Sequence, residues 1–99
     1  MFVILSNYLK PLDEVEKYLQ AHRDYLEIGY QKNYFMASGP KEPRTGGVIL
    51  SQLKDKEVIE NFLYQDPFYL NGIVNYEIIE FLPVKFHPKL KSLLDEERW

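Results

Sequence analysis

The 99-residue sequence contains no cysteine and only two histidines, His22 and His87. Without thiols, neither a disulfide nor a thiolate metal site can form, and two imidazoles are too few for the usual histidine-rich metal site. A glycine-rich phosphate-binding motif is missing as well. We therefore expect neither a metal ion nor a cofactor. Extracellular domains of this size are more often cross-linked, so we expect a cytoplasmic protein.

Basic residues are in the minority, since 12 Lys and Arg stand against 15 Asp and Glu, for a formal net charge of −3. Nucleic-acid binding depends on clustered Lys and Arg, so we expect no nucleic-acid partner. Long apolar runs are also missing, and the apolar segment 1–5 reaches Asn7 and Lys10 too soon for a signal peptide. We therefore expect no membrane partner. No serine lies in a nucleophile elbow, which disfavours a serine hydrolase.

Apolar side chains, by contrast, are plentiful: hydrophobic residues make up 45% of the chain, with eight Tyr and six Phe. This content is enough to bury a core, and the length corresponds to one domain. We place that domain at residues 1–87. Residues 88–99 form a C-terminal tail that could contain a short amphipathic helix.

The periodicity of apolar residues predicts six elements in the order βαββαβ. Pro11 suits a helix first turn, and apolar residues then recur at spacings of four and three along one helix face. Asp55 is a plausible N-cap for a second helix, which the Asp66-Pro67 pair ends. The expected strands are 2–7, 34–37, 48–51 and 73–82, and the expected helices are 11–31 and 55–65.

This order predicts an α+β, ferredoxin-like fold: an antiparallel sheet with two helices on one face. The last strand, however, has apolar residues on both sides, with Val74 and Ile78 on one face and Ile73 and Ile79 on the other. Two helices cover only one face of a sheet. The simplest way to bury the second face is to pack it against the same face of an identical chain, so we expect a homodimer formed through the sheet.

His22 lies on the apolar seam of the first helix, between Leu19 and Leu26. A histidine in such a half-buried position can accept or donate a proton near neutral pH. It can equally fill space while it donates a hydrogen bond to a backbone carbonyl. The position alone leaves both interpretations open.

Asp66 follows the second helix, where the negative end of the helix dipole disfavours a carboxylate. Either Asp66 caps its own Asp-Pro turn, or a group such as protonated His22 compensates its charge. An imidazole oriented by a carboxylate is an effective general base. His22 and Asp66 are therefore our catalytic candidates.

The segment Ser38-Gly39-Pro40 and the following loop 41–47 are rich in turn-forming residues. Glycine lets backbone N–H groups approach a ligand, and Lys41 or Arg44 could pair with a carboxylate. The same composition is also that of an ordinary turn.

Several of these motifs occur together in the order and spacing of the YciI-like (YCII-related) proteins: His22, Ser38-Gly39-Pro40, Thr45 to Leu50, Asp66-Pro67-Phe68 and Asn75 to Phe81. Over residues 1–87 the chain resembles this family. The resemblance implies a dimeric α/β-barrel with His22 and Asp66 at the active-site centre. It also implies that Ser38, Gly39 and Pro40 form the pocket wall, and Tyr69 is a further candidate for substrate contact.

The leading functional hypothesis is a cofactor-independent lyase or isomerase that transfers a proton on a small, aromatic or carboxylated metabolite, with His22 as acid and base. The alternative is a non-catalytic dimeric module that binds a small metabolite or regulates a partner, because ferredoxin-like folds serve both purposes. A purely structural role is a third interpretation.

Overall fold

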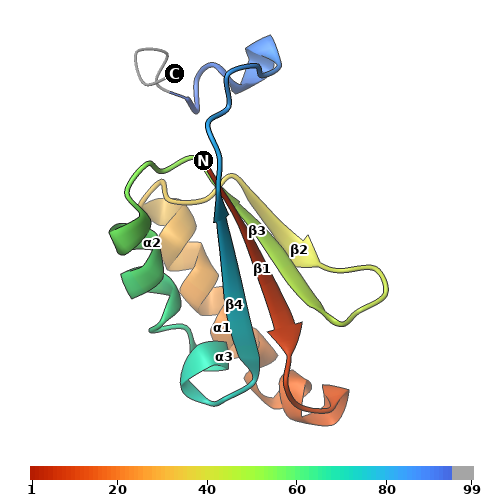
Figure 1. Cartoon of the computed structure of the whole chain (residues 1–99). Coiled ribbons are helices and arrows are strands. Elements are labelled where there is room, and N and C mark those ends of the chain that lie inside the picture. Colours follow the sequence, from red (N-terminus) through yellow and green to blue (C-terminus); the bar gives the residue numbers. More distant parts are fainter. Residues whose placement is uncertain (95–99) are drawn as a thin grey trace.

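The computed structural model describes residues 1–94, which form a four-stranded antiparallel sheet with helices on one face (Figure 1). The elements, in chain order, are β1 (Phe2–Tyr8), α1 (Leu12–Gln31), β2 (Ala37–Pro40), β3 (Gly46–Ser51), α2 (Lys56–Leu63), α3 (Pro67–Leu70), β4 (Val74–Glu80) and the 3-10 helix η1 (Pro88–Leu90). The strand order is β2-β3-β1-β4, and each neighbouring pair is antiparallel. The predicted ferredoxin-like α+β fold is confirmed.

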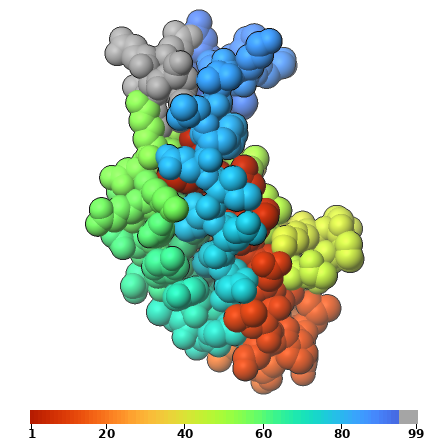
Figure 2. Space-filling view, in the orientation of Figure 1, coloured from red at the N-terminus to blue at the C-terminus, as the bar shows by residue number. Residues whose placement is uncertain are grey.

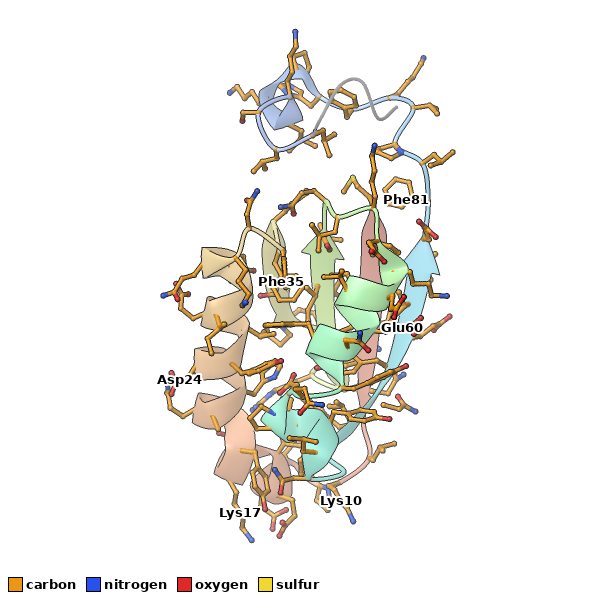
Figure 3. All side chains as sticks on the ribbon, turned by 90° about the vertical axis from the view of Figure 1, so that its left-hand side faces the viewer. Lys10, Lys17, Asp24, Phe35, Glu60 and Phe81 are labelled. Atoms are coloured by element: carbon orange, nitrogen blue, oxygen red, sulfur yellow. The ribbon has the colours of Figure 1, made fainter. Side chains whose placement is uncertain are left out.

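The main core lies between the sheet and helices α1 and α2, which stand side by side in front of the strands in Figure 3. Side chains alternate between the two faces along β1, and those of Phe2 and Ile4 point to the helices and are fully buried in this core. Leu26 of α1 and Ile59 of α2 pack against them. None of the helices within residues 1–94 is both long and apolar enough to cross a membrane.

The opposite face of the sheet carries an apolar row that none of the helices within residues 1–94 covers. Val3 of β1 lies opposite Leu50 of β3 and Ile79 of β4, so the three side chains share this face. Val3 and Leu50 are half-buried, and Ile79 is 42% exposed. The predicted two-sided apolar character is therefore present in the fold. Ile73, which we placed on the second face, is instead buried just before β4 in a core cluster with Val15 and Phe68.

The second strand begins later than predicted. Residues 34–36 connect α1 to the sheet, and the buried ring of Phe35 packs 5.6 Å from the ring of Phe62. Residues 34–36 of the predicted strand therefore connect α1 to the sheet, with Phe35 in the core, and only Ala37 belongs to β2. Ser38-Gly39-Pro40, which we considered as a turn, belongs to the edge strand β2. Figure 2 shows the tip of the β2–β3 hairpin, in yellow, projecting from the domain.

The third strand begins two residues earlier than predicted, at Gly46. A Cβ atom at Gly46 would lie 1.9 Å from the Ser6 carbonyl oxygen, so only glycine permits this approach of β3 to β1. The predicted helix 55–65 ends at Leu63, and a short helix that we did not predict, α3, follows Asp66.

The tail contains only a short helical segment in its described part. Pro88–Leu90 form the 3-10 helix η1, which His87 caps by accepting a hydrogen bond from the Lys89 N–H. Residues 91–94 form turns rather than a helix, and the rest of the segment for which we expected one, 95–99, lies outside the described part of the chain.

Candidate active site

A cavity of about 310 Å3 lies between α1 and the helix-facing side of β1, β2 and β3. Helix α1 supplies one wall, with Leu19, His22, Arg23 and Leu26. Their spacing of three, one and three residues places them on one face of the helix. A histidine and an arginine thus share a stripe that is otherwise apolar.

Asp66 lies behind His22 and is fully buried. Its two carboxylate oxygens lie 2.7 and 3.0 Å from His22 Nδ1. The Phe68 N–H donates to Oδ1 over 2.9 Å, and the Tyr76 hydroxyl donates to Oδ2. Since a buried carboxylate is costly unless its oxygens are satisfied, these three donors explain how Asp66 is tolerated here.

Asp66 therefore has both of the roles that the sequence left open, as a cap of its own turn and as a partner of His22. It is the N-cap of α3, where its side chain accepts the Phe68 N–H, and it also contacts His22. Our view that the α2 dipole opposes this carboxylate was incomplete. The chain turns at Tyr64 and Gln65, so that Asp66 begins the next helix, with N–H groups directed towards it.

The imidazole of His22 is held in one orientation. Its ring stacks on the ring of Phe68, with centroids 4.0 Å apart and planes 7° from parallel. Because an ionised carboxylate only accepts hydrogen bonds, Nδ1 carries the proton. In the neutral ring Nε2 then has a free lone pair, and it makes no hydrogen bond with any residue in the 1–94 range.

Tyr76 holds the second oxygen of Asp66. Burial, and next the negative charge of Asp66, raise the pKa of Tyr76 above its ordinary value of 10.0. The same two causes, in the same order, raise the pKa of Tyr25. Tyr76 therefore remains a protonated donor to Asp66 throughout the neutral pH range.

The predicted substrate-binding residues fall into two groups. Ser38, Gly39 and Pro40 line the cavity from β2, and the Ser38 hydroxyl lies 2.7 Å from the Tyr30 hydroxyl. Tyr69 is 40% exposed and does not line this cavity. Its ring instead lies 6.2 Å from that of Tyr76, on the side of α3 and β4.

The two basic residues considered in the β2–β3 loop also differ in position. Arg44 lines the cavity and forms an ion pair with Glu16, with Nη1 and Oε1 2.5 Å apart. Lys41 donates to Asn7 Oδ1 over 2.8 Å and does not line the cavity.

Sequence reasoning missed two residues of this site, Arg23 and Tyr76. Arg23 lies four residues after Leu19 and next to His22, so the helix period could have placed it on the same face. Tyr76 was covered only by the predicted strand 73–82, and nothing in its sequence context distinguishes a hydrogen-bonding tyrosine from a packing one.

The fold and this site define a small α+β domain with a histidine–aspartate pair beside a cavity. The model of the YCII-related domain matches residues 1–82, and the chain belongs to this family, as the resemblance implied.

A solved structure similar to this chain is 5-chloro-2-hydroxyhydroquinone dehydrochlorinase (TftG) from Burkholderia phenoliruptrix AC1100, in complex with 2,5-dihydroxybenzoquinone. It aligns with a TM-score of 0.67 and 19% identity, over 83% of this chain and 94% of that chain. At this identity the similarity shows a common fold. No curated protein matches the sequence.

Proposed function

We propose that this protein is a small-molecule enzyme of the lyase or isomerase type, which transfers a proton with His22 and needs no cofactor. The observation that carries the proposal is the contact between His22 Nδ1 and the buried Asp66 carboxylate at the edge of a cavity. Asp66 orients the ring and stabilises the imidazolium that forms when His22 accepts a proton.

The chemistry that fits this arrangement begins with a carbon acid. Nε2 accepts the proton of a C–H bond next to a carbonyl group. The electron pair of that bond forms a C=C bond, and the π electrons of the carbonyl group move to its oxygen to give an enolate. In an isomerisation the imidazolium returns the proton to a different carbon. In an elimination the enolate reforms its carbonyl and expels a leaving group as an anion, and the imidazolium then releases its proton to that anion or to water. Neither route requires an oxidant or a reductant.

Two further observations support a small organic substrate. The cavity has both apolar walls, such as Leu19 and Phe68, and polar groups, as ligand sites do. The similar structure is named a dehydrochlorinase and holds a dihydroxybenzoquinone, a small planar ring. For this chain we propose a substrate of the same general size, aromatic or carboxylated.

We also infer that two copies pair through the uncovered sheet face. Val3, Leu50 and Ile79 form an apolar row there, and a second copy would bury both rows at once. This face lies on the side of the sheet opposite α1, so pairing would leave the wall of the cavity that carries His22 intact.

The proposed chemistry can be tested by deuterium incorporation from heavy water. Hydroxylated and halogenated benzenes, unsaturated lactones and keto acids would be incubated with the protein and followed by NMR. We expect the wild type to exchange or convert at least one class, and His22→Gln to reduce the rate by about 10²–10⁴-fold. His87→Gln is the matched control, since His87 is exposed and caps η1. Equal rates in His22→Gln and wild type would favour the non-catalytic binding module.

A further inference from the structure

The charged residues that line the cavity are all basic. Arg23 and Arg44 both contribute to its wall, and none of the lining residues in the described part of the chain is an Asp or a Glu. Asp66 itself is not a lining residue, because it lies behind His22 and its oxygens are engaged by His22, Tyr76 and the Phe68 N–H. In a chain with a net charge of −3, such a cavity is locally positive.

The two arginines differ in how their charges are balanced. The Arg44 guanidinium is paired with Glu16 at 2.5 Å and lies 6.0 Å from the centre of the Tyr8 ring. Arg23 forms no ion pair or hydrogen bond with any other residue among 1–94. Of the two, Arg23 is therefore the cation with its donors available to a ligand.

The place of Arg23 on α1 is also informative. It is exposed, yet it follows His22 directly and lies between Leu19 and Leu26 on the helix face that forms the cavity wall. An arginine at the mouth can keep its stem along these leucines while its guanidinium binds an anion. The planar fork of the guanidinium matches a carboxylate, with two parallel hydrogen bonds.

We propose that the ligand of this cavity is an organic carboxylate, and that Arg23 binds its carboxylate group. The apolar part of the ligand lies against the leucines of α1 and the Phe68 ring, with its reacting carbon near His22. The inference deepens the proposed function, since it concerns the same cavity, but it concerns recognition rather than proton transfer. Arg23 is then the residue that selects ligands with a negative charge.

Binding measurements test this without any knowledge of the reaction. The probes are benzoate, 2-hydroxybenzoate and fumarate, each compared with its neutral amide by calorimetry and by the NMR shifts of the His22 ring. We expect at least one carboxylate to bind the wild type more tightly than its amide. Arg23→Gln should weaken that carboxylate by about tenfold or more and leave the amide unchanged.

Two variants serve as controls. Arg23→Lys keeps the charge but loses the fork, and it should retain part of the affinity. Lys10→Gln makes the same change in net charge at an exposed residue outside the cavity lining, and it should leave binding unchanged. The proposal is overturned if no carboxylate binds the wild type, if amides bind as tightly as acids, or if Arg23→Gln and Lys10→Gln behave alike. The proposed function would fail separately, by the absence of His22-dependent deuterium exchange.

Discussion

The Asp66 carboxylate lies 2.7 Å from His22 Nδ1, although the two residues are 44 positions apart in the chain. Helix α1 presents the imidazole to the cavity, and the turn before α3 places the carboxylate directly behind it. The stacked Phe68 ring prevents the imidazole from turning away. This relationship makes His22 a candidate base with one defined free nitrogen.

Replacing Asp66 by Asn should damage the site more than the fold. The amide keeps the shape of the carboxylate but cannot stabilise an imidazolium, and its NH2 group favours the wrong tautomer of His22. Once a substrate has been found, we expect a rate loss of about 10³–10⁴-fold. We also expect a loss of about 1–3 kcal/mol in the free energy of unfolding by urea, because buried donors lose a charged acceptor. A variant that keeps wild-type turnover would show that Asp66 is only the cap of α3.

Stability at alkaline pH should report on Tyr76. The folded state holds the proton of Tyr76 more tightly than the unfolded chain, whose tyrosines have a pKa of about 10. The contribution is therefore fully present below pH ~10. Above it the unfolded chain releases a proton that the folded state keeps, so the free energy of unfolding falls by up to about 1.4 kcal/mol per pH unit.

Urea denaturation at a series of alkaline pH values measures this slope. Tyr76→Phe should flatten it, whereas Tyr64→Phe, which removes a partly exposed hydroxyl (39% residue exposure), should not. Identical slopes in Tyr76→Phe and wild type would mean that Tyr76 does not hold its proton as its burial beside Asp66 requires.

The ion pair between Glu16 and Arg44 suggests a substitution that should strengthen carboxylate binding rather than weaken it. Glu16→Gln removes the partner of Arg44 at 2.5 Å and leaves the cavity more positive. Carboxylate probes should then bind more tightly, by a few-fold at low salt, and the gain should shrink as salt is added. Calorimetry on Glu16→Gln and on Glu57→Gln, an exposed change outside the cavity lining, separates this local effect from net charge. Weaker binding in Glu16→Gln would contradict a cationic recognition site.

Pairing through the sheet predicts that Ile79→Asp abolishes the dimer. Ile79 is 42% exposed on the uncovered face, whereas Ile28 is 43% exposed on α1. The same substitution at Ile28 is therefore a closely matched control. Light scattering should give a dimer for wild type and Ile28→Asp, and a monomer for Ile79→Asp. A monomeric wild type, or a dimer that survives Ile79→Asp, would exclude this interface.

The contact between α1 and the segment after it predicts a steric effect at Gly29. A Cβ atom there would lie 2.3 Å from Phe35 Cε2, and that ring is itself held near Tyr30 and Phe62. Gly29→Ala should therefore lower the free energy of unfolding by about 1–3 kcal/mol, despite the better helix propensity of alanine. Gly39→Ala, where a Cβ atom meets nothing within 4 Å, should not. Urea denaturation of both variants checks the prediction.

The sequence predicted those parts of the fold that depend on local periodicity. The spacing of apolar residues in α1 identifies that helix and the face it buries, and the short apolar run at the start of the chain identifies β1 as a strand. The start of β2 was predicted wrongly because Phe35 is not a strand residue. Its apolar ring packs against α1 and α2, and no local sequence pattern reveals this tertiary contact.

The site shows the same division between local and tertiary signals. His22 was visible as a polar residue on an apolar seam, and Asp66 as a carboxylate after a helix. Their contact, and the donation from Tyr76 to Asp66, depend on how α1, α3 and β4 meet. Arg23 is next to His22 in the sequence, but only the structure shows that it lines the cavity.

The most direct measurement is NMR of the imidazole nitrogens of His22 in the neutral ring, in wild type and in Asp66→Asn, with His87→Gln used to assign the signals. If Asp66 orients His22 as the base, the wild type carries its proton on Nδ1 and leaves Nε2 free, and Asp66→Asn loses this preference. A wild-type ring protonated on Nε2, or one that the substitution leaves unchanged, would contradict the proposed catalytic pair.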